Sequence, residues 1–118
     1  MNLLLDHNVP RRLWRHLLPH ATTTAREQGW DQLQNGELLK AAADAAFDAF
    51  ISIDKKIEYE HNLMKLPLPV LILDVQSNAL EYLLPLMQPV LALLNKPITP
   101  ALYIISPDGT FQRLTAPR

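Results

Sequence analysis

Residues 2–10, NLLLDHNVP, contain the pattern on which the expected fold depends. An apolar run of strand length ends abruptly on Asp6, and the rigid Pro10 then favours the start of a helix. Residues 49–54, AFISID, repeat the pattern, because a second apolar run ends on Asp54. The carboxyl ends of parallel strands share one edge of a sheet, where α/β proteins bind their ligands. We therefore expect the two aspartates to lie side by side at a functional edge.

Strand and helix patterns alternate along the rest of the chain. Strands are expected at residues 2–5, 21–25, 49–53, 70–74 and 101–106, helices at 11–18, 37–46, 55–62 and 79–94, and a returning hairpin strand at 111–114. Prolines should kink or divide the last helix. This spacing predicts an α/β fold with three layers, α/β/α, whose central sheet is mostly parallel and ends in a C-terminal hairpin. No glycine-rich phosphate loop follows the first strand, which disfavours a dinucleotide-binding fold.

The composition is that of one globular domain. The chain has 118 residues, and 48% of them are hydrophobic. This length suffices for one hydrophobic core and is too short for two. We therefore expect residues 1–118 to form a single domain with a loose tail at 116–118. It contains no cysteine, which excludes disulfides and thiolate metal sites and fits a reducing cytoplasm. The longest apolar stretch, residues 80–94, contains Glu81 and two prolines and is too short to span a membrane. We therefore expect a cytoplasmic protein without membrane contact.

Carboxylates supply the candidate chemical groups. Asp6, Asp54 and Asp74 each end a predicted strand, and Glu37 lies in the first turn of a predicted helix. Such oxygen ligands hold Mg²⁺ or Mn²⁺, and the ion can activate a water for attack on a phosphodiester. An aspartate after a strand is also common as a helix N-cap or turn residue, and this structural explanation applies most strongly to Asp74.

Four motifs occur together in the first two thirds of the chain. They are LLLDHNVPRRL at residues 3–13, AREQGW at 25–30, NGELL at 35–39 and ISIDK at 51–55. Their combination resembles a small branch of domains of unknown function in the PIN-like nuclease superfamily, related to the toxin nucleases of toxin–antitoxin systems. The resemblance covers roughly residues 1–75.

The resemblance implies a PIN-like, Rossmann-like fold across residues 1–118 and a metal-dependent ribonuclease site that uses Mg²⁺ or Mn²⁺. Carried over by position, Asp6, Glu37 and Asp54 match the catalytic, metal-binding acids, and Asn8 matches a polar position that orients Asp6 or a metal-bound water. RNA is the implied substrate. An antitoxin protein and a second copy of the chain are the implied partners.

Two positions depart from the family pattern. Relatives often carry an acid near the position of Asn35, and a further aspartate where this chain has Lys56. Replacing a carboxylate by an ammonium at Lys56 lowers the negative charge of the site by about two units and should weaken cation binding. Asp74, on the neighbouring strand, is the candidate for a replacement ligand.

Basic residues beside the acids are candidates for contacts to RNA phosphates. They are Lys55 and Lys56 after Asp54, and Arg11 and Arg12 at the start of the helix that follows Asp6. A solvated helix surface is the competing explanation for all four. Because the formal net charge is −1, any surface that binds nucleic acid must be local.

The leucines of residues 80–94 exceed the number that one buried helix face needs. They predict an interface with a partner or a second copy, and burial under the C-terminal hairpin is the alternative.

Three functions remain open from the sequence. The first is a metal-dependent endoribonuclease that hydrolyses RNA phosphodiesters with an activated water, as the toxin of a toxin–antitoxin pair. The second is a catalytically degenerate PIN-like domain that acts as a binding or regulatory module, suggested by Asn35 and Lys56. The third, a flavodoxin-like or response-regulator-like phosphoacceptor, ranks lowest because paired acids do not follow the first strand.

Overall fold

A computed structural model describes residues 1–116 except for the side chain of Asn35, and residues 117–118 of the predicted tail lie outside the described part. The strands are β1 (Asn2–Leu5), β2 (Ala21–Thr24), β3 (Ala49–Ser52), β4 (Val70–Leu73), β5 (Leu102–Ile105) and β6 (Phe111–Leu114). The α-helices are α1 (Asn35–Asp44), α2 (Ile57–Glu60), α3 (Leu80–Leu83) and α4 (Met87–Leu94). Short 3₁₀ helices occur at η1 (Arg11–Leu17), η2 (Leu63–Lys65) and η3 (Leu84–Leu86).

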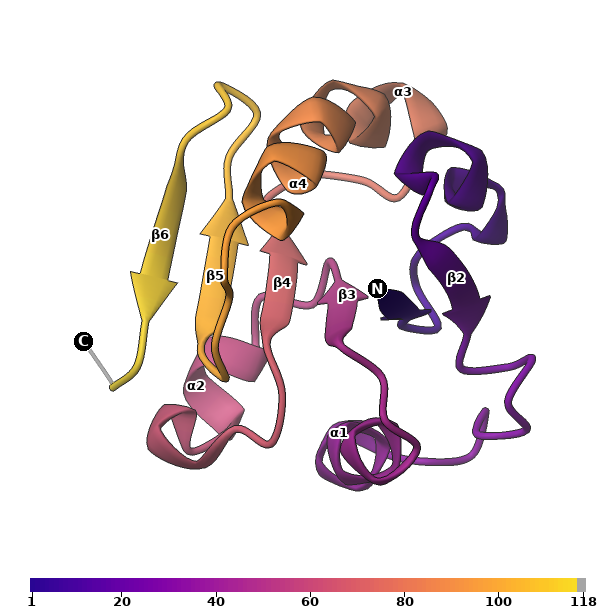
Figure 1. The fold of residues 1–118 in the computed structure, drawn as a ribbon, viewed down its shortest axis with the longest axis vertical. Helices are drawn as coiled ribbons and strands as arrows, with labels where there is room; N and C mark the ends of the chain where they lie inside the picture. The colour runs from indigo at the N-terminus through magenta and orange to yellow at the C-terminus, as the bar shows by residue number, and fades with distance from the viewer. Residues whose placement is uncertain (117–118) are drawn as a thin grey trace.

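One six-stranded sheet with the order β2-β1-β3-β4-β5-β6 runs through the molecule (Figure 1). Its first five strands are parallel, and β6 pairs antiparallel with β5. These observations confirm the predicted α/β class, the mostly parallel sheet and the C-terminal hairpin. From β1 the chain passes to β2 on one side and then crosses to β3 on the other. The gap between the carboxyl ends of β1 and β3 is therefore the topological switch point, where ligands bind in open α/β sheets.

Hydrophobic side chains fill both faces of this sheet. Successive strand residues alternate between two buried clusters, so Leu3 and Leu5 belong to one and Leu4 to the other. Figure 1 shows α1 and α2 on one side of the sheet and α3 and α4 on the other. The arrangement is compatible with a three-layer α/β/α fold.

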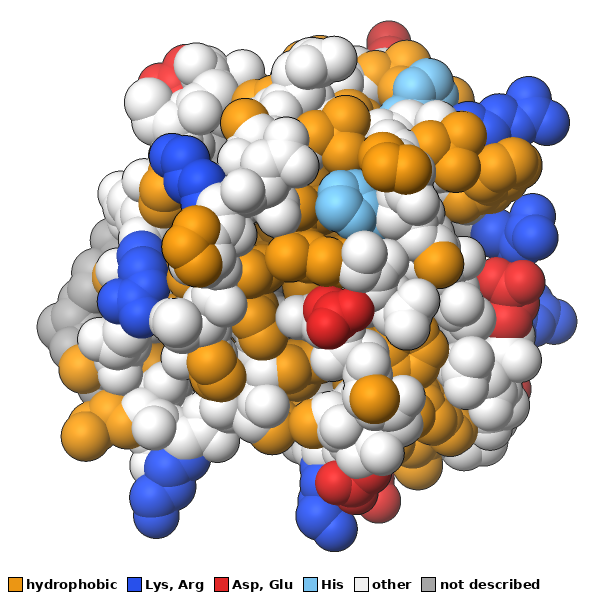
Figure 2. Space-filling model, viewed as in Figure 1, with side chains coloured by type: hydrophobic (Ala, Val, Ile, Leu, Met, Phe, Trp, Pro, Cys, Tyr) orange, Lys and Arg blue, Asp and Glu red, His pale blue; other side chains and the backbone are white. Residues whose placement is uncertain are grey.

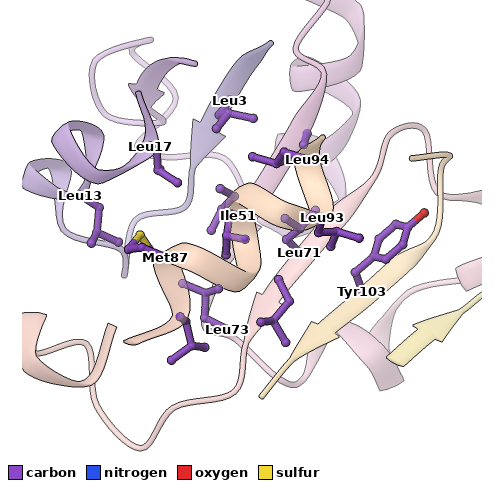
Figure 3. Close-up of a cluster of buried hydrophobic side chains, with 14 of the residues drawn as sticks. Leu3, Leu13, Leu17, Ile51, Leu71, Leu73, Met87, Leu93, Leu94 and Tyr103 are labelled. Atoms are coloured by element: carbon purple, nitrogen blue, oxygen red, sulfur yellow. The ribbon is translucent and has the colours of Figure 1, made fainter. Parts of the chain in front are cut away.

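Most of the leucines that predicted a partner interface pack on the sheet, because Leu83, Leu86, Leu93 and Leu94 are buried in the cluster on this face. Figure 3 shows part of this layer, formed by η1 and α4. Its side chains converge on the sheet from two segments, Leu13 and Leu17 of η1 and Met87, Leu93 and Leu94 of α4. In this segment the large apolar side chains that stay exposed are Tyr82 and Leu84. Most of the leucines are thus buried on the sheet of their own chain, and the homodimer stays a prediction.

Two of the predicted helices differ from simple α-helices. The helix expected at residues 79–94 is divided into α3, η3 and α4, with Pro85 in the first turn of η3, as the prolines predicted. The helix expected at 11–18 is the 3₁₀ helix η1, which ends before Leu18 because a residue preceding proline avoids helical backbone angles. None of the helices in residues 1–116 is long and apolar enough to cross a membrane.

Candidate functional site at the carboxyl edge of the sheet

Asp6 is a buried carboxylate at the switch point. The pairing of β1 with β3 extends one residue beyond the strand, because the Asp6 N–H donates to the carbonyl oxygen of Ile51 at 2.9 Å. Only 4% of Asp6 is exposed. The Ser52 hydroxyl donates to its Oδ2 at 2.7 Å, and the His7 N–H donates to its Oδ1 at 2.8 Å. Among residues 1–116 no basic side chain forms an ion pair with Asp6. Hydrogen bonds alone therefore hold this carboxylate.

Ser52 joins Asp6 to the start of the next loop. Its side chain is completely buried, and its Oγ accepts the N–H of Asp54 at 2.9 Å while it donates to Asp6. The Lys56 N–H in turn donates to Oδ1 of Asp54 at 3.0 Å. One hydroxyl thus ties the Asp6 side chain to the backbone of Asp54. The structure brings these two predicted residues to the same edge of the sheet.

Glu37 has a different local role. It lies exposed in the first turn of α1, and its Oε1 accepts the N–H of Gln34 at 3.4 Å as part of a capping box. No three His, Asp or Glu side chains within the described residues are close enough to hold a metal ion together. The structure therefore does not assemble Asp6, Glu37 and Asp54 into one three-acid group.

Asp74 at the end of β4 is paired with a cation. Its carboxylate lies 2.5 Å from Nζ of Lys55, and the two side chains are 41% and 54% exposed. Its backbone N–H donates to the carbonyl oxygen of Ile105 at 2.9 Å, which extends the pairing of β4 with β5. The pair lies in a depression of about 320 Å³ that Tyr59 also lines. A predicted metal ligand and a predicted phosphate-binding lysine thus bind each other.

Asn8 carries a buried acceptor beside this edge. Its backbone carbonyl accepts Nδ2 of Asn78 at 3.2 Å, which ties the loop after β1 to the loop before α3. Its side-chain Oδ1 is buried and accepts no hydrogen bond from any described residue. Such an atom costs about 1–3 kcal/mol when nothing compensates it. A buried, unsatisfied oxygen thus lies two residues after Asp6 in sequence, and the supporting role of Asn8 stays a prediction.

A depression of about 750 Å³ opens beside Asp6, at the ends of β1 and β2. Its lining includes Arg11, which is one of the predicted site residues. Thr24, Arg26 and Glu27 also line it, and these three were not predicted. Arg12 does not line this depression and borders another one farther along η1. Arg11 also lines that second depression, so the two arginines are neighbours there, and Arg11 alone of the two also lines the depression beside Asp6.

A hydrogen-bond network fixes one wall of this depression. Glu27 Oε1 accepts both the N–H and the hydroxyl of Thr24 at 3.1 Å, and the Glu27 N–H donates to the Thr24 hydroxyl oxygen at 3.1 Å. Glu27 Oε2 lies 3.1 Å from Nε of Arg11. The Thr24 N–H and the Arg11 guanidinium hold the pKa of Glu27 below its ordinary value. The spacing Thr-x-x-Glu is that of a capping box and was the sequence signal for this network.

Basic side chains do not form a continuous surface on the face of the molecule that Figure 2 shows. Its Lys and Arg side chains lie apart from one another around the rim of the view. This face therefore lacks the wide basic patch typical of general nucleic-acid binding.

Buried Asp6, Asp54 at the same sheet edge and the depression beside Asp6 define the candidate site. The chain matches no family model, no curated protein and no solved structure. The resemblance to PIN-like nucleases stays a prediction from the motifs.

Proposed function

We propose that the chain is a metal-dependent endoribonuclease of PIN-like type that hydrolyses RNA phosphodiesters at the edge between β1 and β3. The observation that carries this proposal is the environment of Asp6, a buried carboxylate at the switch point that has no ion pair within residues 1–116. A buried charge without a counter-charge is costly in a protein. A bound cation at this edge would compensate it.

The oxygen atoms present fit Mg²⁺ or Mn²⁺. Each oxygen of Asp6 accepts one hydrogen bond and keeps a lone pair for a further partner. Asn8 contributes the buried Oδ1 that has no donor among the described residues, and Asp54 contributes a second carboxylate. Mg²⁺ is usually held by only one or two carboxylates, with waters and substrate phosphates as its other ligands. A three-acid cluster is therefore not required before RNA binds.

The chain's own residues position the reacting groups in this proposal. A bound ion would activate a water and neutralise the charge that develops on the phosphodiester. Ser52 fixes the direction of the Asp6 carboxylate, and the Lys56 N–H fixes that of Asp54. Arg11, whose Nε contacts Glu27, and the exposed Lys56 would contact flanking phosphates in this proposal, whereas the ammonium group of Lys55 is paired with Asp74.

The biological role follows from the resemblance alone. A toxin nuclease would act on RNA in the cytoplasm and would be inhibited by an antitoxin protein. A reading frame for a small protein beside that of this chain would support this role.

The second candidate function is a catalytically degenerate module that binds or regulates without cleaving. Two observations favour it. Glu37 caps its own helix, and Asp74 is neutralised by Lys55, so two of the predicted acids are engaged outside any metal site.

The direct test is RNA cleavage in Mg²⁺ or Mn²⁺. Asp6→Asn should lower the rate by about a hundredfold or more, because the ion contributes several kcal/mol and each 1.36 kcal/mol is a factor of ten. Asp44→Asn removes an exposed carboxylate at the end of α1 and should cleave like the wild type. Equal rates for Asp6→Asn and the wild type would contradict the proposal.

Calorimetric titration with Mn²⁺ separates the two candidate functions. Binding heat that is lost in Asp54→Ala supports the enzyme. A wild type that neither binds Mn²⁺ nor cleaves RNA supports the module.

A further inference from the structure

The depression beside Asp6 has the size and the lining of a nucleotide site. Its volume of about 750 Å³ falls within the range of about 300–1,000 Å³ that is usual for small-ligand pockets. Val9 and Pro10 give it an apolar part, and Arg11 and Arg26 give it two cations. Because Asp6 also lines it, whatever occupies the depression lies next to the residue that we propose for cleavage.

Arg11 is the cation whose position is most firmly set. It contacts Glu27 through Nε, and Glu27 is held in place by three hydrogen bonds with Thr24. A guanidinium group has five N–H donors, so one contact through Nε leaves the terminal nitrogens for a phosphate. The network thus presents a pre-oriented arginine at the rim, with its side chain 64% exposed.

We infer that this depression binds one nucleotide of the RNA strand beside the bond that is cut, an inference that rests on the proposed function. Arg11 is its phosphate-binding residue, and Glu27 is the positioning residue that holds Arg11. The apolar part formed by Val9 and Pro10 takes the sugar or base. This division of roles is typical of single-stranded RNA, in which phosphate contacts set the register and unstacked bases enter pockets.

The charge of Glu27 makes the inference sharply testable. Three carboxylates, those of Asp6, Glu27 and Asp31, line the depression with only two guanidinium groups. By overall electrostatics, Glu27 repels RNA, so Glu27→Gln should tighten binding. If Glu27 instead acts by holding Arg11, the same substitution should weaken binding. The two explanations therefore predict opposite signs.

The experiment measures binding of a short, fluorescein-labelled single-stranded RNA of mixed sequence to the full chain, with Ca²⁺ in place of Mg²⁺. Arg11→Met should weaken binding severalfold and reduce the slope of log affinity against log salt by about 0.7, the value for one phosphate contact on a single strand. Arg12→Met, at the neighbouring position outside the depression, is the matched control and should change both quantities less.

Glu27→Gln and Thr24→Val should weaken RNA binding in the same direction as Arg11→Met, and Arg11→Lys should restore part of the affinity. Glu81→Gln removes an exposed carboxylate far from this network in sequence and should leave binding unchanged or slightly tighter. In cleavage assays Glu27→Gln should raise KM and leave kcat nearly unchanged, which a general loss of folding would not do.

Tighter or unchanged binding by Glu27→Gln overturns the positioning role. An unchanged salt slope in Arg11→Met overturns the phosphate contact. If the wild type cleaves RNA, and Arg11→Met binds and cleaves RNA as well as the wild type does, the inferred nucleotide site is wrong and the proposed function stands. If the wild type neither binds nor cleaves RNA with Ca²⁺, Mg²⁺ or Mn²⁺, both are wrong.

Discussion

Asp6 and Asp74 follow the same sequence pattern and have opposite environments. Each ends an apolar parallel strand, and each extends its strand pairing by one backbone hydrogen bond. Asp6 is 4% exposed and is held by the Ser52 hydroxyl. Asp74 is 41% exposed and is paired with the ammonium group of Lys55. One carboxylate is buried without an ion pair to any described residue, whereas the other is neutralised at the surface.

The difference arises from β3 and the loop that follows it. Ser52 and Lys55 lie three residues apart on this one segment, and they reach the strands on its two sides. The edge between β3 and β1 is the switch point, whereas β4 follows β3 in the chain and lies beside it without a change of direction in the strand order. A strand-end aspartate is thus a candidate ligand only where its spatial neighbours leave its charge uncompensated.

The largest expected contrast between the two environments is in catalysis. Asp54→Asn, which alters the edge shared with Asp6, should lower RNA cleavage by about a hundredfold, as expected for a ligand whose ion contributes several kcal/mol. Asp74→Asn should stay within about threefold of the wild type, because Lys55 already neutralises that carboxylate. Initial rates in Mg²⁺ measure both effects. Equal losses in the two variants would contradict the assignment of different roles to Asp6 and Asp74.

The second contrast is in folding stability. Ser52→Ala leaves the Asp6 carboxylate without its hydroxyl donor and the Asp54 N–H without its acceptor, which should cost about 1–3 kcal/mol. Lys55→Met should cost only about 0.2–1 kcal/mol, and less in high salt, because the pair with Asp74 is exposed to solvent. Urea unfolding at low and high salt measures both. A Ser52→Ala variant no less stable than Lys55→Met would show that the buried hydrogen bonds add little.

Much of the fold could be predicted because β1, β3, β4 and β5 contain continuous apolar runs with clear ends. β3 and β4 are buried on both faces, and such runs indicate central parallel strands without any knowledge of the partner strands. The strand order could not be predicted, since it depends on which helix covers which face. The apolar pattern also could not predict that η1 is a 3₁₀ helix, because it only requires Leu13 and Leu17 to lie on one side of a helix.

The site was predicted where it depends on strand ends and missed where it depends on side-chain partners. Asp6, Ser52 and Asp54 meet because parallel strands end at one edge. Glu37 was assigned to the metal by resemblance, but its position three residues after Gln34 also suits a helix cap. The pair of Lys55 with Asp74 forms across two strands, so sequence spacing did not reveal it.

Glu27 combines the two kinds of partner, a hydroxyl as at Asp6 and a cation as at Asp74, and it provides the smallest and most specific test. Because the Thr24 N–H and Arg11 lower its pKa below the ordinary value of 4.5, the unfolded chain binds more protons than the folded one in the acid range. The stability that Glu27 contributes is therefore fully present above pH 4.5 and is lost as the pH falls through the lowered pKa. With 41% of the side chain exposed, the contribution should be below about 1 kcal/mol.

Glu27→Gln should accordingly lower the free energy of unfolding slightly at neutral pH and converge with the wild type in acid. Arg11→Met should show part of the same convergence, because it removes the cation and leaves the Thr24 hydrogen bonds. Urea unfolding at a series of acid pH values measures the difference. Parallel curves for Glu27→Gln and the wild type would mean that Glu27 has no preferred charge state in the fold. A stable, ionised Glu27 would then no longer account for the position of Arg11, and the positioning role of Glu27 would be wrong.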